Sequence, residues 1–142
     1  MKRILALDVG TVRIGVAVSD PLGSFAQGIA VFAADRDWLA ELDKTVAAYG
    51  VQVIVLGLPV RTTGEEGPEA KRIHTLAKKL RRRYPDLEIT TWDERFTTVT
   101  ASQVLLEADV SREKRKGHVD KIAATVLLQG YLDRLRERGG AP

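Results

Sequence analysis

Apolar runs alternate with amphipathic stretches along the chain, and this alternation predicts its secondary structure. Five short apolar runs, bounded by glycine, proline or polar residues, have the length and composition of strands. They lie at residues 4–7, 14–18, 28–32, 51–58 and 87–92. Four longer segments carry helix signals, either apolar residues at helical spacing or a polar residue suited to an N-cap. They cover residues 35–49, 68–84, 97–108 and 119–138, and Asp35 and Thr97 or Thr98 are the expected N-caps of the first and third.

The order of these segments predicts the topology of the sheet. A short turn joins the first two runs, which predicts an antiparallel hairpin, and Gly10 is expected to adopt a positive φ in that turn. The later order of strand, helix and strand predicts right-handed crossovers and parallel pairs. We therefore expect one α/β domain over residues 1–138, with a sheet that starts as a meander and ends in parallel strands, and a tail at 139–142.

Composition narrows the class of protein. The chain has 142 residues, no cysteine and a net charge of +3, so disulfides and thiolate metal sites are excluded. The first apolar run is too short for a signal peptide core or a membrane span, which predicts a cytoplasmic protein without a membrane partner. Basic residues concentrate at 78–83 and 112–116, and each cluster fits solvated surface as well as phosphate binding. Residues 109–118 contain few apolar positions and are expected to form a mobile loop.

Acidic side chains are expected to converge at one edge of the sheet. Asp8 ends the first strand, while Asp93 and Glu94 follow the last, and parallel strands share their C-terminal edge. Asp120 lies in the first turn of the last helix, on the side that carries its apolar residues, and so faces the sheet. Each position has a local explanation: a turn for Asp8, a surface ion pair with Arg95 for Glu94, and the helix dipole for Asp120.

Together these carboxylates point to metal chemistry. Clustered carboxylates repel one another and acquire raised pKa values, and a hard cation such as Mg²⁺ or Mn²⁺ removes that repulsion. Two such ions can promote in-line attack on a phosphodiester, whose phosphates the basic clusters would contact. Other chemistries have less support, because the two histidines lie far apart and glycine-rich phosphate motifs and a nucleophile-elbow serine are absent.

Several blocks of sequence resemble the YqgF/RuvX family of small bacterial proteins. They read LDVGT (7–11), IGVAVSD (14–20), VLGLP (55–59), DERFTT (93–98), DKIAA (120–124) and LLQGYL (127–132). The family is described as Holliday junction resolvases and as nucleases that mature the 5′ end of pre-16S rRNA. The resemblance implies an RNase H-like fold, with a five-stranded mixed sheet flanked by helices. It also implies catalytic and metal-binding roles for Asp8, Glu94 and Asp120.

The chain departs from the pattern of better-understood resolvases of this fold at one strand end. Those resolvases place a carboxylate at the exit of the fourth strand, where this chain reads Gly57-Leu58-Pro59. Glu94 would then have to replace that carboxylate from the next strand. The candidate phosphate contacts are Arg13, Arg61, Arg95, Arg115, Lys116 and Lys121.

The resulting hypothesis is a metal-dependent nuclease that acts on structured nucleic acid. Pre-16S rRNA is the favoured substrate, branched DNA is the alternative, and ribosomal particles are further partners. A non-catalytic RNA-binding assembly factor on the same scaffold is a second alternative. An actin-like nucleotide-binding module is a third, because Asp8-x-Gly-Thr before a hairpin also resembles a phosphate-binding turn, although that fold needs two lobes.

Overall fold

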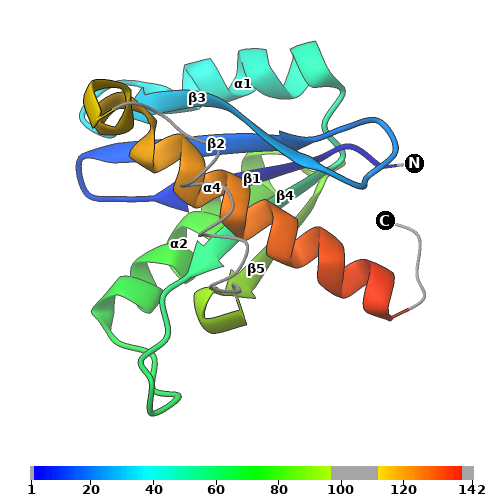
Figure 1. The fold of residues 1–142 in the computed structure, drawn as a ribbon. Helices are drawn as coiled ribbons and strands as arrows, with labels where there is room; N and C mark the ends of the chain where they lie inside the picture. The colour runs from blue at the N-terminus through cyan, green and yellow to red at the C-terminus, as the bar shows by residue number, and fades with distance from the viewer. Residues whose placement is uncertain (1, 97–111, 139–142) are drawn as a thin grey trace.

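A mixed five-stranded sheet forms the centre of the computed structural model, which describes residues 2–96 and 112–138, without the side chains of Phe96 and 112–120 (Figure 1). Its strand order is β3-β2-β1-β4-β5. The strands are β1 (Ile4–Val9), β2 (Arg13–Ser19), β3 (Ala26–Ala33), β4 (Val53–Leu58) and β5 (Glu88–Asp93). β1, β2 and β3 pair antiparallel, whereas β4 pairs parallel with both β1 and β5. The predicted meander followed by parallel strands is confirmed.

Helices cover both faces of this sheet, as the alternation of side chains along each strand requires. α1 (Trp38–Tyr49) and α2 (Pro68–Arg83) pack on the face that contains Leu5 and Leu7 of β1. α4 (Arg112–Glu137) covers the opposite face, against Ile4 and Ala6. A short 3-10 helix, η1 (Glu94–Phe96), follows β5 directly. In the part of the chain that is described, no helix combines the length and apolarity needed to cross a membrane.

Two predicted helix starts are wrong. The N-cap of α1 is Asp37, whose side chain accepts a hydrogen bond from the backbone N of Ala40, and not Asp35. α4 begins at Arg112, so residues 112–118 are helical and not a loop. Lysine, arginine and glutamate favour helix even where they bury nothing, so this helix extends beyond its apolar periodicity. The predicted helix at 97–108, residues 109–111 and the tail at 139–142 lie outside the described residues.

The turn between β1 and β2 depends on glycine for a reason that differs from the prediction. The glycines with positive φ among the described residues are Gly23, Gly50 and Gly64, and Gly10 is not one of them. The backbone N of Gly10 donates to the carbonyl O of Arg13 at 2.9 Å. A Cβ on Gly10 would lie 2.7 Å from that oxygen, so the tight approach of the two strands excludes a side chain there.

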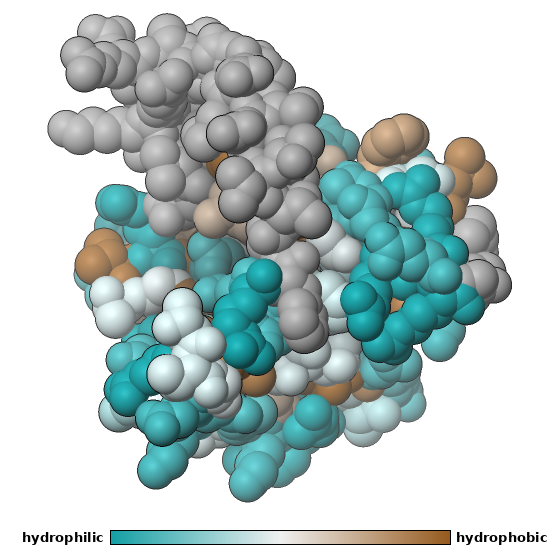
Figure 2. All heavy atoms as spheres, turned by 60° about the horizontal axis from the view of Figure 1, so that its bottom comes forward, coloured by the Kyte–Doolittle hydropathy of each residue, from teal (hydrophilic) through white to brown (hydrophobic). Residues whose placement is uncertain are grey.

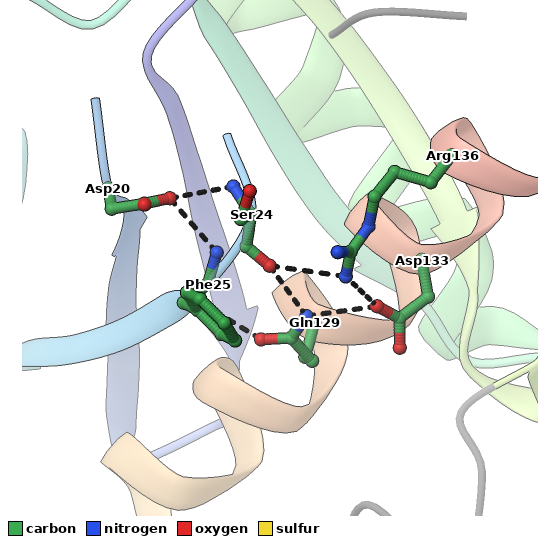
Figure 3. A network of polar contacts seen from close by, with 7 residues as sticks. Asp20, Ser24, Phe25, Gln129, Asp133 and Arg136 are labelled. Atoms are coloured by element: carbon green, nitrogen blue, oxygen red, sulfur yellow. Dashed lines mark hydrogen bonds and ion pairs between the residues drawn. The ribbon is translucent and has the colours of Figure 1, made fainter. Parts of the chain in front are cut away.

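The turn between β2 and β3 lies at the opposite end of the sheet, where side-chain hydrogen bonds hold it in place (Figure 3). Asp20 accepts hydrogen bonds from the backbone N–H groups of Ser24 and Phe25, at 2.7 and 2.9 Å. Gln129 of α4 accepts from Ala26 N and donates to Ser24 O, both at 3.0 Å. This hairpin is therefore tied to the last helix by contacts that span more than a hundred residues of sequence.

Candidate active site

Asp8 lies at the C-terminal end of β1, on the face of the sheet that α4 covers. Alternate residues of a strand share a face, and Ile4 and Ala6 pack in the core beneath α4. Asp8 continues that row and is half-buried. Its neighbour Leu7 pairs with Leu56 of β4, so the carboxylate lies at the edge where β1 and β4 both end.

Glu94 reaches Asp8 from the other side of β4. It begins η1 directly after β5, and a side-chain hydrogen bond joins its carboxyl group to that of Asp8. A Cβ built on Gly57 of β4 would lie only 2.6 Å from Glu94 Oε1. The Glu94 carboxyl group therefore occupies the space that a side chain at position 57 would fill. The structure brings the predicted pair Asp8 and Glu94 together, and the absence of a side chain at Gly57 of β4 makes this approach possible.

Burial and a neighbouring carboxylate perturb the carboxyl group of Glu94. Its pKa is raised from 4.5 to about 7, mainly by desolvation, then by the charge of Asp8 and the hydrogen bond to it, with a smaller contribution from Asp93. The residue keeps exposed surface, but its carboxyl group is the end that lies against Gly57 and Asp8. A divalent cation bound between two adjacent carboxylates would remove the repulsion that helps to raise this pKa.

Arg95 does not neutralise this pair. Its Nη2 and Nε donate to Asp93 Oδ2 at 2.7 and 3.0 Å, and its backbone N donates to Asp93 Oδ1 at 2.9 Å. These bonds hold the pKa of Asp93 below its usual range. The explanation of Glu94 as the surface partner of Arg95 is therefore wrong, because Arg95 binds the preceding carboxylate and leaves Glu94 to Asp8.

At residue 120 of α4, the structure describes the backbone but not the side chain. The side chain of Asp120 lies outside the described residues, so its convergence on the pair stays a prediction. α4 does reach the site further along, because Leu127 Cδ2 would lie 3.1 Å from a Cβ on Gly57. Among the described side chains, no group of three or more histidine or acidic residues is arranged around a metal position. The described part of the candidate site is thus the pair Asp8 and Glu94.

The structure describes the side chains of some of the other predicted phosphate contacts. Arg13 begins β2 beside the β1–β2 turn, and Arg61 lies in the exposed loop after β4. Lys121 is half-buried on α4, where its Cβ would lie 3.0 Å from a Cβ on Gly28 of β3. Arg115 and Lys116 belong to α4, and their side chains lie outside the described residues.

Sequence reasoning missed two residues at this edge. Gly57 was noted only for its lack of a carboxylate, whereas the structure shows that it makes room for Glu94. Arg72 of α2 donates from Nη2 to the carbonyl O of Val9 at 3.4 Å, next to Asp8 along the chain. A signal for Arg72 was present, since it lies in the second turn of a helix that begins at this same edge.

Comparisons with known proteins agree with this architecture. A family model described as "RuvX: Holliday junction resolvase" matches residues 2–134. A protein of Moorella thermoacetica named "Putative pre-16S rRNA nuclease" is 49% identical over 142 residues, covering 96% of this chain and 99% of its own length. A protein of the same name from Halalkalibacterium halodurans is 49% identical over 139 residues, covering 93% and 96%.

Solved structures show the same fold at low identity. Fowlpox virus resolvase in complex with Holliday junction DNA matches with a TM-score of 0.56 and 16% identity, covering 94% of this chain and 98% of its own. RuvC of T. thermophilus, also in complex with a Holliday junction substrate, matches with a TM-score of 0.55 and 9% identity, covering 99% and 98%. These likenesses establish the RNase H-like fold that the sequence predicted.

Proposed function

The chain belongs to the family described as RuvX, Holliday junction resolvase, and from this membership we propose that it is a nuclease that hydrolyses phosphodiester bonds in structured nucleic acid. The favoured substrate is the precursor of 16S rRNA, processed in the cytoplasm at its 5′ end. Relatives with 49% identity carry that name, whereas the junction-bound resolvases share the fold at 16% identity or less. Ribosomal particles that contain this precursor are the corresponding partners.

The observation that carries the proposed chemistry is the contact between Asp8 and Glu94. The pair offers only oxygen ligands, the pKa of Glu94 is raised to about 7, and both groups lie at the sheet edge where α/β folds place their sites. This donor set fits Mg²⁺ or Mn²⁺, with Asp120 as the third ligand from α4. A divalent cation held there would activate water and stabilise the departing oxygen.

The remaining groups of the proposed site would position the substrate. Arg13, Arg61 and Lys121 would contact phosphates around the carboxylate pair, since arginine and lysine bind phosphate oxygens without reading sequence. Arg95 would do so while it stays bound to Asp93, because a guanidinium has more donors than one carboxylate uses. Arg115 and Lys116 would add two more contacts from the first turns of α4.

Cleavage of two substrates tests the proposal. An RNA that spans the mature 5′ end of 16S rRNA and a four-way DNA junction are each incubated with the protein in Mg²⁺, in Mn²⁺ or with EDTA. We expect metal-dependent cleavage of the RNA, and a loss of at least about 10²-fold in Asp8→Asn, because loss of a residue that only supports a metal ligand already costs about 10–100-fold in affinity or activity. Asp20→Asn, which removes a carboxylate at the other end of the sheet, should cleave at the wild-type rate.

The outcomes separate the alternatives. Cleavage of the junction with the RNA left intact would make the protein a junction resolvase, the function that the family description names. Binding of the RNA without cleavage of either substrate would favour a non-catalytic assembly factor. Equal cleavage rates for Asp8→Asn and the wild type would refute the site assignment.

A further inference from the structure

The exposed side of α2 carries a concentration of positive charge outside the carboxylate site. We define the α2 basic surface as Lys71, Arg72, Lys78, Lys79 and Arg82, all of which are exposed. The core-facing side of the same helix buries Ala70, Ile73, Ala77 and Leu80. With 3.6 residues per turn, burial of those positions places Lys71, Lys78 and Arg82 along the outermost line of the helix. Eleven residues separate the first and last of them, a span of about 16 Å along the axis.

Structural roles account for the neighbouring arginines but not for the lysines of this surface. Arg83 donates to the carboxylate of Asp43 on α1, and Arg81 donates to the carbonyl O of Ile89 on β5. In contrast, no ion pair within the described ranges joins a carboxylate to Lys71, Lys78, Lys79 or Arg82. Positive side chains also favour the last turn of a helix, which explains Arg82.

The same dipole argument makes Lys71 unfavourable. It lies in the first turn of α2, where the helix end is partly positive and prefers acidic residues. Lys78 and Arg82 are also four residues apart, and like charges at that spacing repel one another. The α2 basic surface thus carries an electrostatic cost that an anionic partner would remove.

The first turns of α2 bring one end of this surface to the sheet edge of the candidate active site, on the face opposite to α4. α2 follows β4 along the chain and begins at the edge where Asp8 and Glu94 meet, and Arg72 donates to the carbonyl O beside Asp8. The helix then runs away from that edge. Figure 2, which turns the lower side of Figure 1 toward the viewer, shows mainly hydrophilic side chains on the described part of this side, with small hydrophobic spots between them.

We propose that the α2 basic surface binds the phosphate backbone of a double-helical RNA flank that extends from the active site. The inference rests on the proposed function. It adds that α2 binds a part of the RNA that lies beyond the reach of the carboxylate pair. A row of lysine and arginine about 16 Å long faces several successive phosphates. The interaction supplies affinity and register without reading sequence, so it should depend strongly on salt.

Binding measurements on a matched pair of triple variants test this surface. Lys71→Gln with Lys78→Gln and Arg82→Gln removes three charges from α2. Lys2→Gln with Lys44→Gln and Arg138→Gln removes three exposed charges from other elements and serves as the control. Both sets are placed in an Asp8→Asn background, so that binding is measured without cleavage. Circular dichroism verifies that each variant keeps the helix content of the parent protein.

Two RNAs are compared across a range of salt concentrations. One carries a double-helical flank of about two turns beyond the cleavage position, and the other ends at that position. On the flanked RNA, the α2 variant should lower the slope of log affinity against log salt by about 2–3, at about 0.7–0.9 for each lost phosphate contact. Its affinity at 0.1 M salt should fall at least about tenfold. On the truncated RNA it should match the control variant.

The possible results are distinct from those that test the activity itself. Equal salt slopes for the α2 and control variants on the flanked RNA would overturn the proposal, and so would equal losses on both RNAs. If the wild type cleaves neither RNA but the α2 variant still loses flank-dependent binding, the proposed activity fails and the binding surface stands. With the active protein, the α2 changes should raise KM for the flanked RNA and leave kcat unchanged.

Discussion

The two ends of the sheet treat their carboxylates in opposite ways. At one end, Asp20 accepts two backbone hydrogen bonds, which together with the Arg3 charge lower its pKa. At the other end, Glu94 lies against a second carboxylate, Asp8, and its pKa is raised to about 7. Figure 3 shows the first arrangement, in which the Asp20 carboxylate faces the backbone N–H groups of Ser24 and Phe25.

This difference separates stability from function within one fold. The hydrogen bonds at the β2–β3 turn lower the free energy of the folded state and leave no charge unmatched. The Asp8–Glu94 contact costs free energy in the metal-free protein, because two carboxylates must lose solvent and share a proton. Strongly perturbed groups of this kind concentrate at active sites, where a ligand supplies the missing interaction.

Among variants that leave both carboxylates in place, Gly57→Ala should reduce cleavage most. The added Cβ would lie 2.6 Å from Glu94 Oε1, and this oxygen is at the end of a flexible side chain that can move away. Cleavage should fall about a hundredfold, the loss expected from a misplacement of about 1 Å, while the thermal unfolding midpoint changes little. Rate measurements and a melting curve on the same sample check both parts.

A paired variant controls for simple crowding at position 57. Gly57→Asp with Glu94→Ala returns a carboxylate to the same space from β4, so it should cleave faster than Gly57→Ala with Glu94→Ala. Equal rates for these two double variants would show that cleavage does not require a carboxylate in this space. A large loss of stability in Gly57→Ala would show instead that the neighbouring Leu127 cannot adjust.

An intermediate effect, on stability alone, is expected at the opposite end of the sheet. Gln129→Ala removes the acceptor of Ala26 N and the donor to Ser24 O. The free energy of unfolding should fall by about 1–3 kcal/mol, since a partly buried N–H loses its partner. Cleavage at a temperature where both proteins are folded should stay within about twofold of wild type. A tenfold loss of cleavage would mean that the two ends are coupled.

The sequence predicts part of this difference between the two ends of the sheet, but not all of it. The meeting of Asp8 and Glu94 follows from strand order, because parallel strands end at a common edge. The role of Gly57 does not, since it depends on how far a side chain from the neighbouring strand reaches across β4. The Gln129 contacts also escape sequence reasoning, because they join positions more than a hundred residues apart.

Local preference misled the prediction at two places. The segment that begins α4 is basic and lacks apolar periodicity, which predicts a loop, but the helix begins at Arg112, consistent with the helix propensity of its lysine, arginine and glutamate residues. Arg95 follows Glu94 directly, which predicts an ion pair between them. In the structure the guanidinium binds Asp93, whose carboxylate also accepts the backbone N–H of Arg95 and so fixes that geometry.

The smallest effect is a difference in how stability depends on pH. The raised pKa of Glu94 means that the metal-free folded protein binds more protons than the unfolded chain between about pH 4.5 and 7. The contribution of Glu94 therefore weakens the folded state as pH rises through that window. Asp20 has a lowered pKa, so its contribution is present above about pH 3.8 and is lost as pH falls through the folded-state pKa.

Urea midpoints of the metal-free protein between pH 3 and pH 8 measure both contributions. Glu94→Gln should flatten the decline between about pH 4.5 and 7, and Asp20→Asn should flatten the loss in acid. A Glu94→Gln protein with the same decline as the wild type would place the perturbed proton elsewhere.

The central claim is that Asp8 and Glu94 together bind a divalent cation, and direct Mn²⁺ binding tests it. Calorimetric titration, with electron paramagnetic resonance to count bound Mn²⁺, is performed on the wild type, Asp8→Asn, Glu94→Gln and Gln129→Ala. The wild type and Gln129→Ala should bind Mn²⁺ alike, whereas each carboxylate variant should bind at least about tenfold more weakly, because loss of a residue that only hydrogen-bonds a metal ligand already costs about 10–100-fold. Equal Mn²⁺ affinity in all four proteins would contradict the account.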